Sequence, residues 1–166
     1  MQFKTGDYVV HPAYGVGSVV RLEEKRLAEA EPRWYYVIDV GKGTVWVPVD
    51  SHEPLGLRSV TSHEELDQCR RLLKSKPVAL AKDHHRRRLE IGERVKQGSF
   101  RVLCEVVRDL SAYGWNRTLN DVDAGLLAKV RANICREWSA ATKISMEQAN
   151  TEVEALLQSG RRAHQS

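Results

Sequence analysis

The spacing of apolar residues along the chain changes near residue 60. Before this point, apolar residues gather in short runs rich in Val, Tyr, Trp and Ile, separated by glycine and proline, which is typical of short β-strands. After it, apolar residues recur every three or four positions, which is the period of an amphipathic helix. We therefore predict an α+β protein with two domains, a β domain over residues 1–60 and an all-helical domain over residues 61–166.

The first domain is expected to be a small β-barrel. Its strands are predicted from the runs DYVVH, GSVVRLE, RWYYVIDV and TVWVPV. Four or five strands of this length within about 60 residues favour a strongly curved barrel over a sandwich. In the last run, Trp46 alternates with valines and therefore faces away from them. Pro48 places this run at the edge of the sheet or at a strand end.

The second domain is expected to contain about five helices around one core. Ser62 followed by Glu65 is a capping-box pattern at the start of the first helix. Gly98 is predicted to end the second helix in the left-handed conformation, and Ser145 is the predicted N-cap of the last. The predicted helices lie within residues 61–77, 84–97, 99–114, 120–141 and 145–160.

Composition and charge narrow the classes of function. No apolar run approaches the roughly 20 residues that span a bilayer, and the first residues lack the pattern of a signal peptide, so we expect a cytoplasmic protein without a membrane partner. The net charge is +4, and residues 82–101 contain seven basic and three acidic side chains. Such a local basic excess can attract nucleic acid, and it is also common on a solvated helix face.

The chain carries no recognisable metal or catalytic motif. Cys69, Cys104 and Cys135 are scattered without a CxxC pair, which favours three reduced thiols. His84 and His85 have no Cys or His three or four positions away, so we expect no metal there. Gly-rich phosphate loops and the GxSxG and HExxH motifs are also missing. We therefore expect a non-enzymatic protein without a cofactor or small-molecule substrate.

The N-terminal region has a family resemblance. Residues 3–24, FKTGDYVVHPAYGVGSVVRLEE, resemble the opening of the CarD/CdnL family of bacterial transcription regulators, a module that also occurs in the transcription-repair coupling factor. Residues 47–51 and 55–60 resemble the closing strands of this module. Residues 105–110 and 126–131 resemble helices of the family. The resemblance therefore spans nearly the whole chain.

The resemblance implies a two-domain transcription regulator. In the family, an SH3-like or Tudor-like β domain binds the β subunit of RNA polymerase, largely by pairing an edge strand with it. The helical domain contacts promoter DNA beside the upstream edge of the transcription bubble, and the two domains together stabilise the open complex. Strand addition needs only an exposed row of backbone groups, so a polymerase site of this kind leaves few side-chain signatures.

The resemblance points to two polymerase-binding residues. Lys25 lies where many relatives carry an arginine, and a lysine keeps the charge but loses the bidentate fork. Trp46 lies where some relatives carry a second arginine. Two roles are open for this tryptophan: an anchor at the polymerase surface, or packing on the barrel or the helical domain.

The segment DHHRRR, residues 83–88, is the candidate DNA contact. His84 falls where many relatives have a tryptophan that wedges into the minor groove at the fork of the bubble, and a histidine stacks less well. His85 follows it in the same segment. Arg86, Arg87 and Arg88 suit phosphates, although they cannot all face one way, so one or two of them are expected to reach DNA. The alternative is a solvated face, with an arginine paired to a nearby glutamate.

Further basic residues extend this expectation. Lys129 and Arg131 match basic positions of the family on a neighbouring helix and are predicted to add phosphate contacts. Arg108 and Asp109 are expected to hold the helices together. A rival interpretation remains open, in which the protein docks on the polymerase while its DNA wedge is weakened or lost. Trp115 compensates for the missing wedge only if its loop lies close to the fork.

Overall fold

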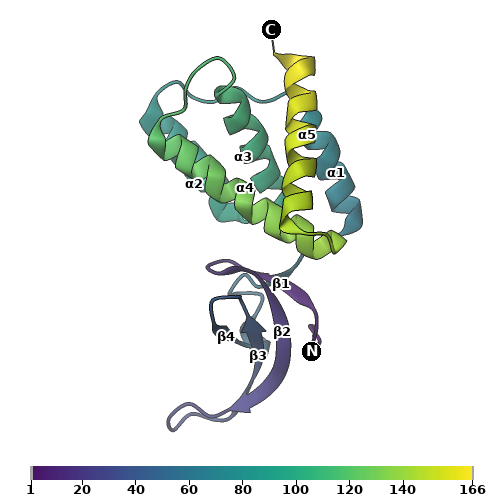
Figure 1. Ribbon diagram of the computed structural model, residues 1–166. Coiled ribbons are helices and arrows are strands. Elements are labelled where there is room, and N and C mark those ends of the chain that lie inside the picture. Colours follow the sequence, from purple (N-terminus) through teal and green to yellow (C-terminus); the bar gives the residue numbers. More distant parts are fainter. Residues whose placement is uncertain (1, 166) are drawn as a thin grey trace. The chain divides into compact units, whose positions relative to one another are not determined.

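The computed structural model describes residues 2–165 (Figure 1). The chain forms two compact units that divide between Val60 and Thr61, here called the β unit and the helical unit. Within the described residues, the β unit is a five-stranded antiparallel sheet and the helical unit contains five α-helices. The α+β class predicted from the apolar spacing is confirmed.

Neighbouring strands of the β unit are antiparallel. Its strand order is β4-β3-β2-β1-β5, so β4 and β5 are the edge strands. The edge position of β4 confirms the prediction for the run that contains Pro48, which has no backbone N–H to donate. The elements are β1 (Tyr8–His11), β2 (Gly15–Lys25), β3 (Arg33–Asp39), β4 (Thr44–Pro48), β5 (Arg58–Ser59) and the short 3₁₀ helix η1 (Val49–Ser51).

The sheet bends around its own core. Strand β2 is long and visibly curved in Figure 1, and its pairing with β3 shifts between Val19 and Arg21, an irregularity that increases local twist. Gly17 lets β2 pass close to β3, because a Cβ at this position would lie 2.7 Å from the backbone oxygen of Asp39. The buried core residues of this unit are Phe3, Val9, Val19, Tyr36, Ile38, Val47 and Leu57.

Three helix ends of the helical unit lie at the predicted capping residues. Ser62 and Glu65 form a complete capping box, Gly98 has a φ of 68°, and Ser145 caps the last helix. These contacts confirm the three predicted caps, whereas the last helix extends four residues beyond the predicted range, to His164. The helices are α1 (His63–Lys74), α2 (His84–Gln97), α3 (Phe100–Tyr113), α4 (Asp121–Thr142) and α5 (Met146–His164).

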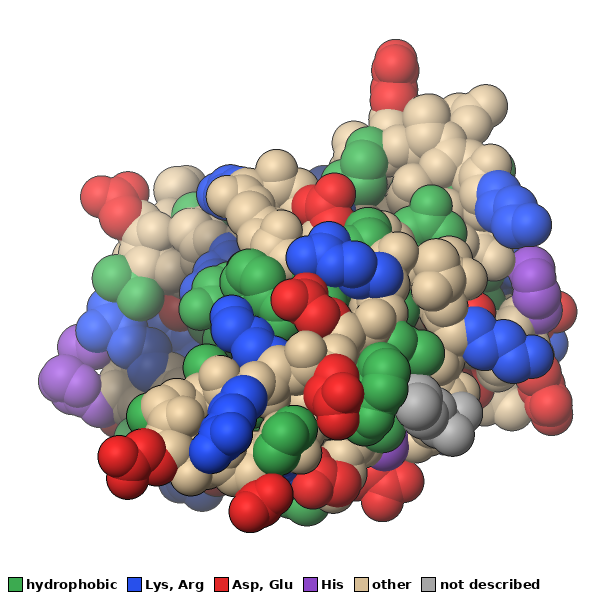
Figure 2. Space-filling view, turned by 90° about the horizontal axis from the view of Figure 1, so that it is seen from below, with side chains coloured by type: hydrophobic (Ala, Val, Ile, Leu, Met, Phe, Trp, Pro, Cys, Tyr) green, Lys and Arg blue, Asp and Glu red, His purple; other side chains and the backbone are tan. Residues whose placement is uncertain are grey.

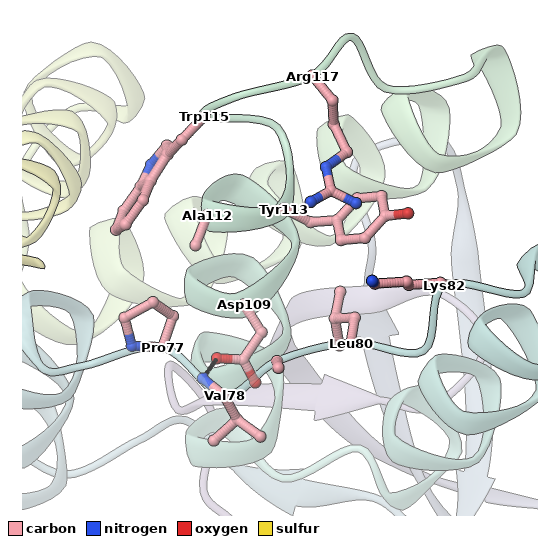
Figure 3. A pocket seen from close by; sticks show the side chains of 10 residues that line it. Pro77, Val78, Leu80, Lys82, Asp109, Ala112, Tyr113, Trp115 and Arg117 are labelled. Carbon is pink, nitrogen blue, oxygen red and sulfur yellow. Dashed lines mark hydrogen bonds between the residues drawn. The ribbon is translucent and has the colours of Figure 1, made fainter. Parts of the chain in front are cut away.

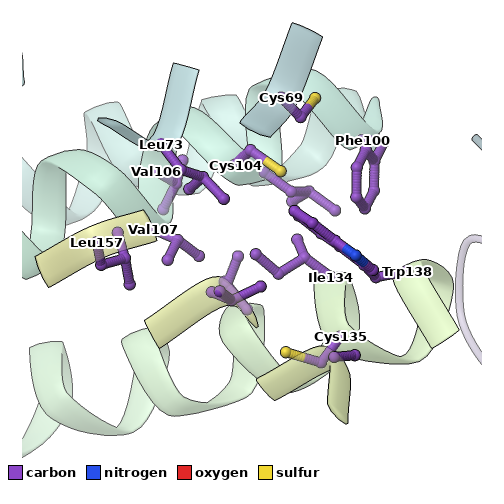
Figure 4. Close-up of a cluster of buried hydrophobic side chains, with 14 of the residues drawn as sticks. Cys69, Leu73, Phe100, Cys104, Val106, Val107, Ile134, Cys135, Trp138 and Leu157 are labelled. Atoms are coloured by element: carbon purple, nitrogen blue, oxygen red, sulfur yellow. The ribbon is translucent and has the colours of Figure 1, made fainter. Parts of the chain in front are cut away.

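One apolar core joins the helices (Figure 4). Trp138 of α4 is fully buried, and its ring centroid lies 6.3 Å from that of Phe100. Cys69, Cys104 and Cys135 are buried free thiols, as predicted. A hydrogen bond with Cys69, together with burial, raises the pKa of the Cys104 thiol well above its usual value, which keeps this thiol protonated and unreactive.

A buried carboxylate fixes the segment between α1 and α2. Asp109 of α3 is 1% exposed, and its Oδ1 accepts a hydrogen bond of 2.9 Å from the backbone N–H of Val78. The same carboxylate accepts hydrogen bonds from Arg94 at 2.9 Å and Arg108 at 2.8 Å. The structural role predicted for Arg108 and Asp109 is therefore confirmed. This arrangement sets the path of the chain into α2.

Candidate nucleic-acid interface

The first turn of α2 exposes two imidazoles. The side chain of Asp83 accepts a hydrogen bond of 3.0 Å from the backbone N–H of Arg86 and so caps the helix directly before His84. His84 and His85 are both exposed, and their ring centroids lie 4.4 Å apart. The N-terminus of a helix attracts anions because its free N–H groups and dipole are positive there. The Asp83 carboxylate already takes this place, so a phosphate would bind the exposed side chains of this turn rather than the helix end itself.

Arg86 and Arg88 flank the same turn. Because successive helical residues are about 100° apart, the inward direction of Arg87 sends its two neighbours to opposite sides of the helix. Arg86 donates to Glu90 at 3.0 Å, which is the glutamate pairing considered as the alternative to a DNA contact. Both side chains of this pair are largely exposed, at 76% and 46%, and such a pair contributes only about 0–1 kcal/mol. Arg88 is exposed, and none of residues 2–165 pairs with its guanidinium.

Arg87 is part of the core, and its assignment to DNA is wrong. It is 3% exposed, and its Nη2 and Nε donate to Oδ2 of Asp123 at 2.7 and 3.0 Å. Its Nη1 donates to the carbonyl oxygens of Ala81 and Lys82 and to the hydroxyl of Tyr113, at 3.0–3.2 Å. A guanidinium held by these partners cannot reach a phosphate. The spacing of Arg87 and Ile91 on the apolar stripe of α2 was the signal for this inward direction.

Lys129 and Arg131 on α4 have different surroundings. Lys129 is exposed, so it remains a candidate for a phosphate contact. Arg131 is turned toward α5, where its Nη1 lies 2.6 Å from Oε2 of Glu154 and its Nε donates to Asn150 at 3.1 Å. The hydrogen bond from Gln158 and this pairing with Arg131 lower the pKa of the Glu154 carboxyl. Because its guanidinium is used to join two helices, we do not retain Arg131 as a DNA contact.

Two basic residues near α2 were missed by sequence reasoning. Lys82 lies directly before the helix, and Arg117 lies in the loop between α3 and α4. The guanidinium of Arg117 lies 4.1 Å from the ring centroid of Tyr113, the ring that Arg87 also contacts at 4.6 Å. Lys82 and Arg117 line one cavity together, and Lys82 and Arg86 line a neighbouring hollow. Asp83 and Glu90 also line this hollow, so the basic side chains are interspersed with two carboxylates. Linear spacing could not reveal that Lys82 and Arg117 meet at one cavity.

Lys25 and Trp46 meet on the outer face of the β unit. The ammonium of Lys25 lies 4.6 Å from the centroid of the Trp46 ring, and the indole N–H of Trp46 lies 3.4 Å from Oε2 of Glu23. This indole and the Arg21 guanidinium lower the pKa of the Glu23 carboxyl. Trp46 is directly opposite Val37 in the sheet, and Val37 is fully buried although it is on this outer face. Trp46 thus packs on the sheet and leaves 39% of its surface exposed.

The surface of the molecule shows little segregation of charge where it is seen in Figure 2. On that face, acidic and basic side chains lie next to one another, with apolar side chains between them. Among residues 2–165, no group of three or more His, Cys, Asp or Glu side chains is placed to hold a metal ion. The helices of the described chain are also too short or too polar to cross a membrane.

Comparison with known proteins first identifies the class, which is that of transcription factors. Residues 3–61 match the family model described as the CarD-like/TRCF RID domain, and residues 68–154 match the CarD C-terminal domain. The chain belongs to the CarD family. One similar protein is the putative transcription factor YdeB of Bacillus subtilis (strain 168), 28% identical over 127 residues, which cover 75% of this chain and 82% of YdeB.

Replacing Arg87 by alanine should destabilise the helical unit by about 3–5 kcal/mol, because it leaves the carboxylate of Asp123 buried without its partner. Unfolding in urea measures this loss of stability. Hydrogen exchange of the backbone amides in α2 and α4 shows where it occurs. The matched control is Arg88→Ala, which removes an exposed arginine from the next position and should change stability by less than about 0.5 kcal/mol. Equal effects of the two substitutions would contradict the assignment of Arg87 to the core.

Proposed function

We propose that this transcription regulator binds the β subunit of RNA polymerase through residues 1–60 and promoter DNA through residues 61–166, and that it stabilises the open complex. Membership of the CarD family supports the general role. The observation that carries the DNA part is the first turn of α2, where His84, Arg86 and Arg88 are exposed around one helix N-terminus. The protein acts in this proposal by binding, without catalysing a reaction.

The DNA contact is proposed to combine phosphate binding with stacking. Arg86 and Arg88 flank the end of α2, so a DNA backbone that crosses this end meets a guanidinium on each side. His84 and His85 lie in the same turn with their ring centroids 4.4 Å apart, and their flat rings can stack on an exposed base step at the upstream edge of the bubble. Lys129 adds a further exposed charge on α4.

The polymerase contact is proposed to use the open edge of the sheet. Strand β4 is an edge strand, and such a strand offers unpaired backbone N–H and C=O groups to a strand of another protein. Trp46 lies on this strand with 39% of its surface exposed, beside the ammonium of Lys25. Tryptophan is enriched among residues that dominate binding energy at interfaces. A polymerase strand paired with β4 would therefore meet both an aromatic and a charged side chain.

A second candidate function follows from the size of the His84 ring. An imidazole offers less stacking surface than the tryptophan of many relatives, and in this structure it already packs against His85. A protein with this turn can dock on the polymerase and bind phosphates without wedging the fork. Copurification with RNA polymerase, followed by measurement of the open-complex lifetime, separates the two: the first function predicts a longer lifetime, and the second predicts binding without it.

Substitution of Lys25 by glutamate should weaken binding to the polymerase β subunit, because it places a carboxylate beside Glu23 and removes the cation from the Trp46 ring. Titration calorimetry with the isolated β subunit measures this change. Lys42→Glu is the matched control, because it makes the same change of charge at an exposed loop position before β4. Unaltered affinity after Lys25→Glu would exclude this residue from the contact.

Loss of Arg86 and Arg88 together, by substitution with alanine, should weaken binding to DNA of any sequence. The slope of log K against log salt should become shallower by about 0.9 for each phosphate contact removed. Fluorescence anisotropy over a range of salt concentrations gives this slope. The control is Arg71→Ala, which removes an exposed arginine from α1. A slope that stays at the wild-type value would show that neither arginine of α2 touches the backbone.

Exchange of His84 for tryptophan should lengthen the open-complex lifetime, because a larger ring offsets more of the few kcal/mol that unstacking a base step costs. His84→Ala should shorten the lifetime only modestly. The measurement uses a promoter whose open complex is unstable, challenged with a competitor after the complex has formed. His63→Trp, at an exposed residue at the start of α1, is the control for a new surface tryptophan. If the two tryptophan variants behave alike, His84 does not lie at the fork.

A further inference from the structure

A cavity of about 290 Å³ lies beside the N-terminal end of α2 (Figure 3). Three parts of the helical unit form it: the segment that leads into α2, the last turn of α3, and the loop between α3 and α4. The indole of Trp115 forms one wall, and Pro77, Val78 and Leu80 form an apolar floor (Figure 3).

The walls of the cavity are held in place from several sides. Asp109 fixes the backbone of Val78 through a 2.9 Å hydrogen bond, and Arg87 binds the carbonyl oxygen of Lys82 at 3.1 Å. The carbonyl oxygen of Trp115 accepts hydrogen bonds of 3.4 Å from Arg161 and from the side-chain amide of Gln165. A cavity whose walls are fixed in this way is preformed, which lowers the entropy lost when a ligand binds.

The cavity is positively charged on one side. Lys82 extends its ammonium into the hollow, and the guanidinium of Arg117 lies opposite the floor, over the Tyr113 ring (Figure 3). No carboxylate among residues 2–165 pairs with either of these two cations. Asp109 is the acidic residue of the lining, and its charge is compensated by Arg94 and Arg108. An occupant should therefore combine a flat apolar surface with negative charge.

We propose that the cavity accepts one unpaired base of single-stranded DNA, stacked against Trp115, with its phosphate bound by Lys82 and Arg117. Stacking on an aromatic side chain beside a basic groove is the general mode by which proteins hold single strands. The volume lies near the lower end of the range for ligand pockets, about 300–1,000 Å³, which suits one base better than a folded peptide segment. The proposal rests on the proposed contact with promoter DNA.

The position of the cavity agrees with a strand that separates at α2. Lys82 lines this cavity and also the hollow that contains Arg86, together with Asp83 and Glu90. A DNA backbone that binds Arg86 can therefore reach the cavity by way of Lys82. His84 then meets the last paired bases, and the cavity holds a base beyond them. In this arrangement Trp115 supplies the large aromatic surface that His84 lacks, at a different place in the same interface.

The test compares two DNA probes with the full-length protein. Fluorescence anisotropy measures binding to a labelled duplex and to the same duplex with unpaired bases at one end. The wild-type protein should prefer the forked probe. Trp115→Ala should weaken binding to the forked probe by about 5- to 100-fold and leave duplex binding unchanged, and Trp115→Phe should restore part of the loss. Lys82→Glu should also reduce the preference for the forked probe. The side chain of Lys82 is exposed, so this change should leave the fold intact.

One control variant and three contrary outcomes distinguish failure of the base pocket from failure of DNA binding. Trp34→Ala removes an exposed tryptophan from the β unit and should leave both probes unaffected. If the wild-type protein binds both probes equally and the binding depends on Arg86 and Arg88, the base pocket is refuted while the DNA-binding function stands. If neither probe binds, the DNA-binding function itself fails. If Trp115→Ala and Lys82→Glu weaken binding to RNA polymerase and leave both probes unaffected, the cavity holds a protein side chain instead of a base.

Discussion

The buried ion pair between Arg87 and Asp123 fixes the position of α2, and thereby the side chains that the helical unit presents to a partner. It joins the first turn of α2 to the first turn of α4, and the same guanidinium holds the two carbonyl groups before α2 and the ring of Tyr113. One oxygen of Asp123, Oδ1, has no partner among the described residues. An ion pair of this kind contributes little net stability, but it strongly disfavours arrangements that leave either charge alone. Its role is to fix the position of α2.

This position determines which side chains are available to a partner. With Arg87 turned inward, Arg86 and Arg88 point to opposite sides of α2, and His84 is exposed at its first turn. The segment before α2 places Lys82 in the same cavity lining as Arg117. Asp109 supports the same segment from α3. The basic surface is therefore a consequence of two buried carboxylates. It is built on helices and a tethered segment, so its charged groups are held apart at set positions, which suits the regular spacing of phosphates.

Local signals in the sequence predicted most of the fold. Ser62, Gly98 and Ser145 mark helix ends through contacts with residues three or four positions away, so their effect can be read from short stretches. The functional surface depends on contacts between distant residues. The partner of Arg87 lies 36 positions away, and that of Arg131 lies 23 positions away. A run of three arginines does not reveal which of them is buried, although the apolar stripe of α2 gave a partial indication. The family resemblance assigned Lys25 and Trp46 to one predicted contact, but their proximity was not predicted from the sequence.

Trp46, on the outer face of the sheet, affects two properties of the protein: its solubility and its choice of partner. Val37 is fully buried on this face, and its direct cross-strand neighbours are Arg21 on β2 and Trp46 on β4. A smaller residue at position 46 would uncover this apolar residue of the internal strand β3, next to the open edge strand β4, where strands of other molecules can add. Variation at this site is therefore constrained by solubility as well as by partner choice. Changes in partner affinity during evolution should accumulate first at Lys25, whose side chain can vary without uncovering the strand beneath.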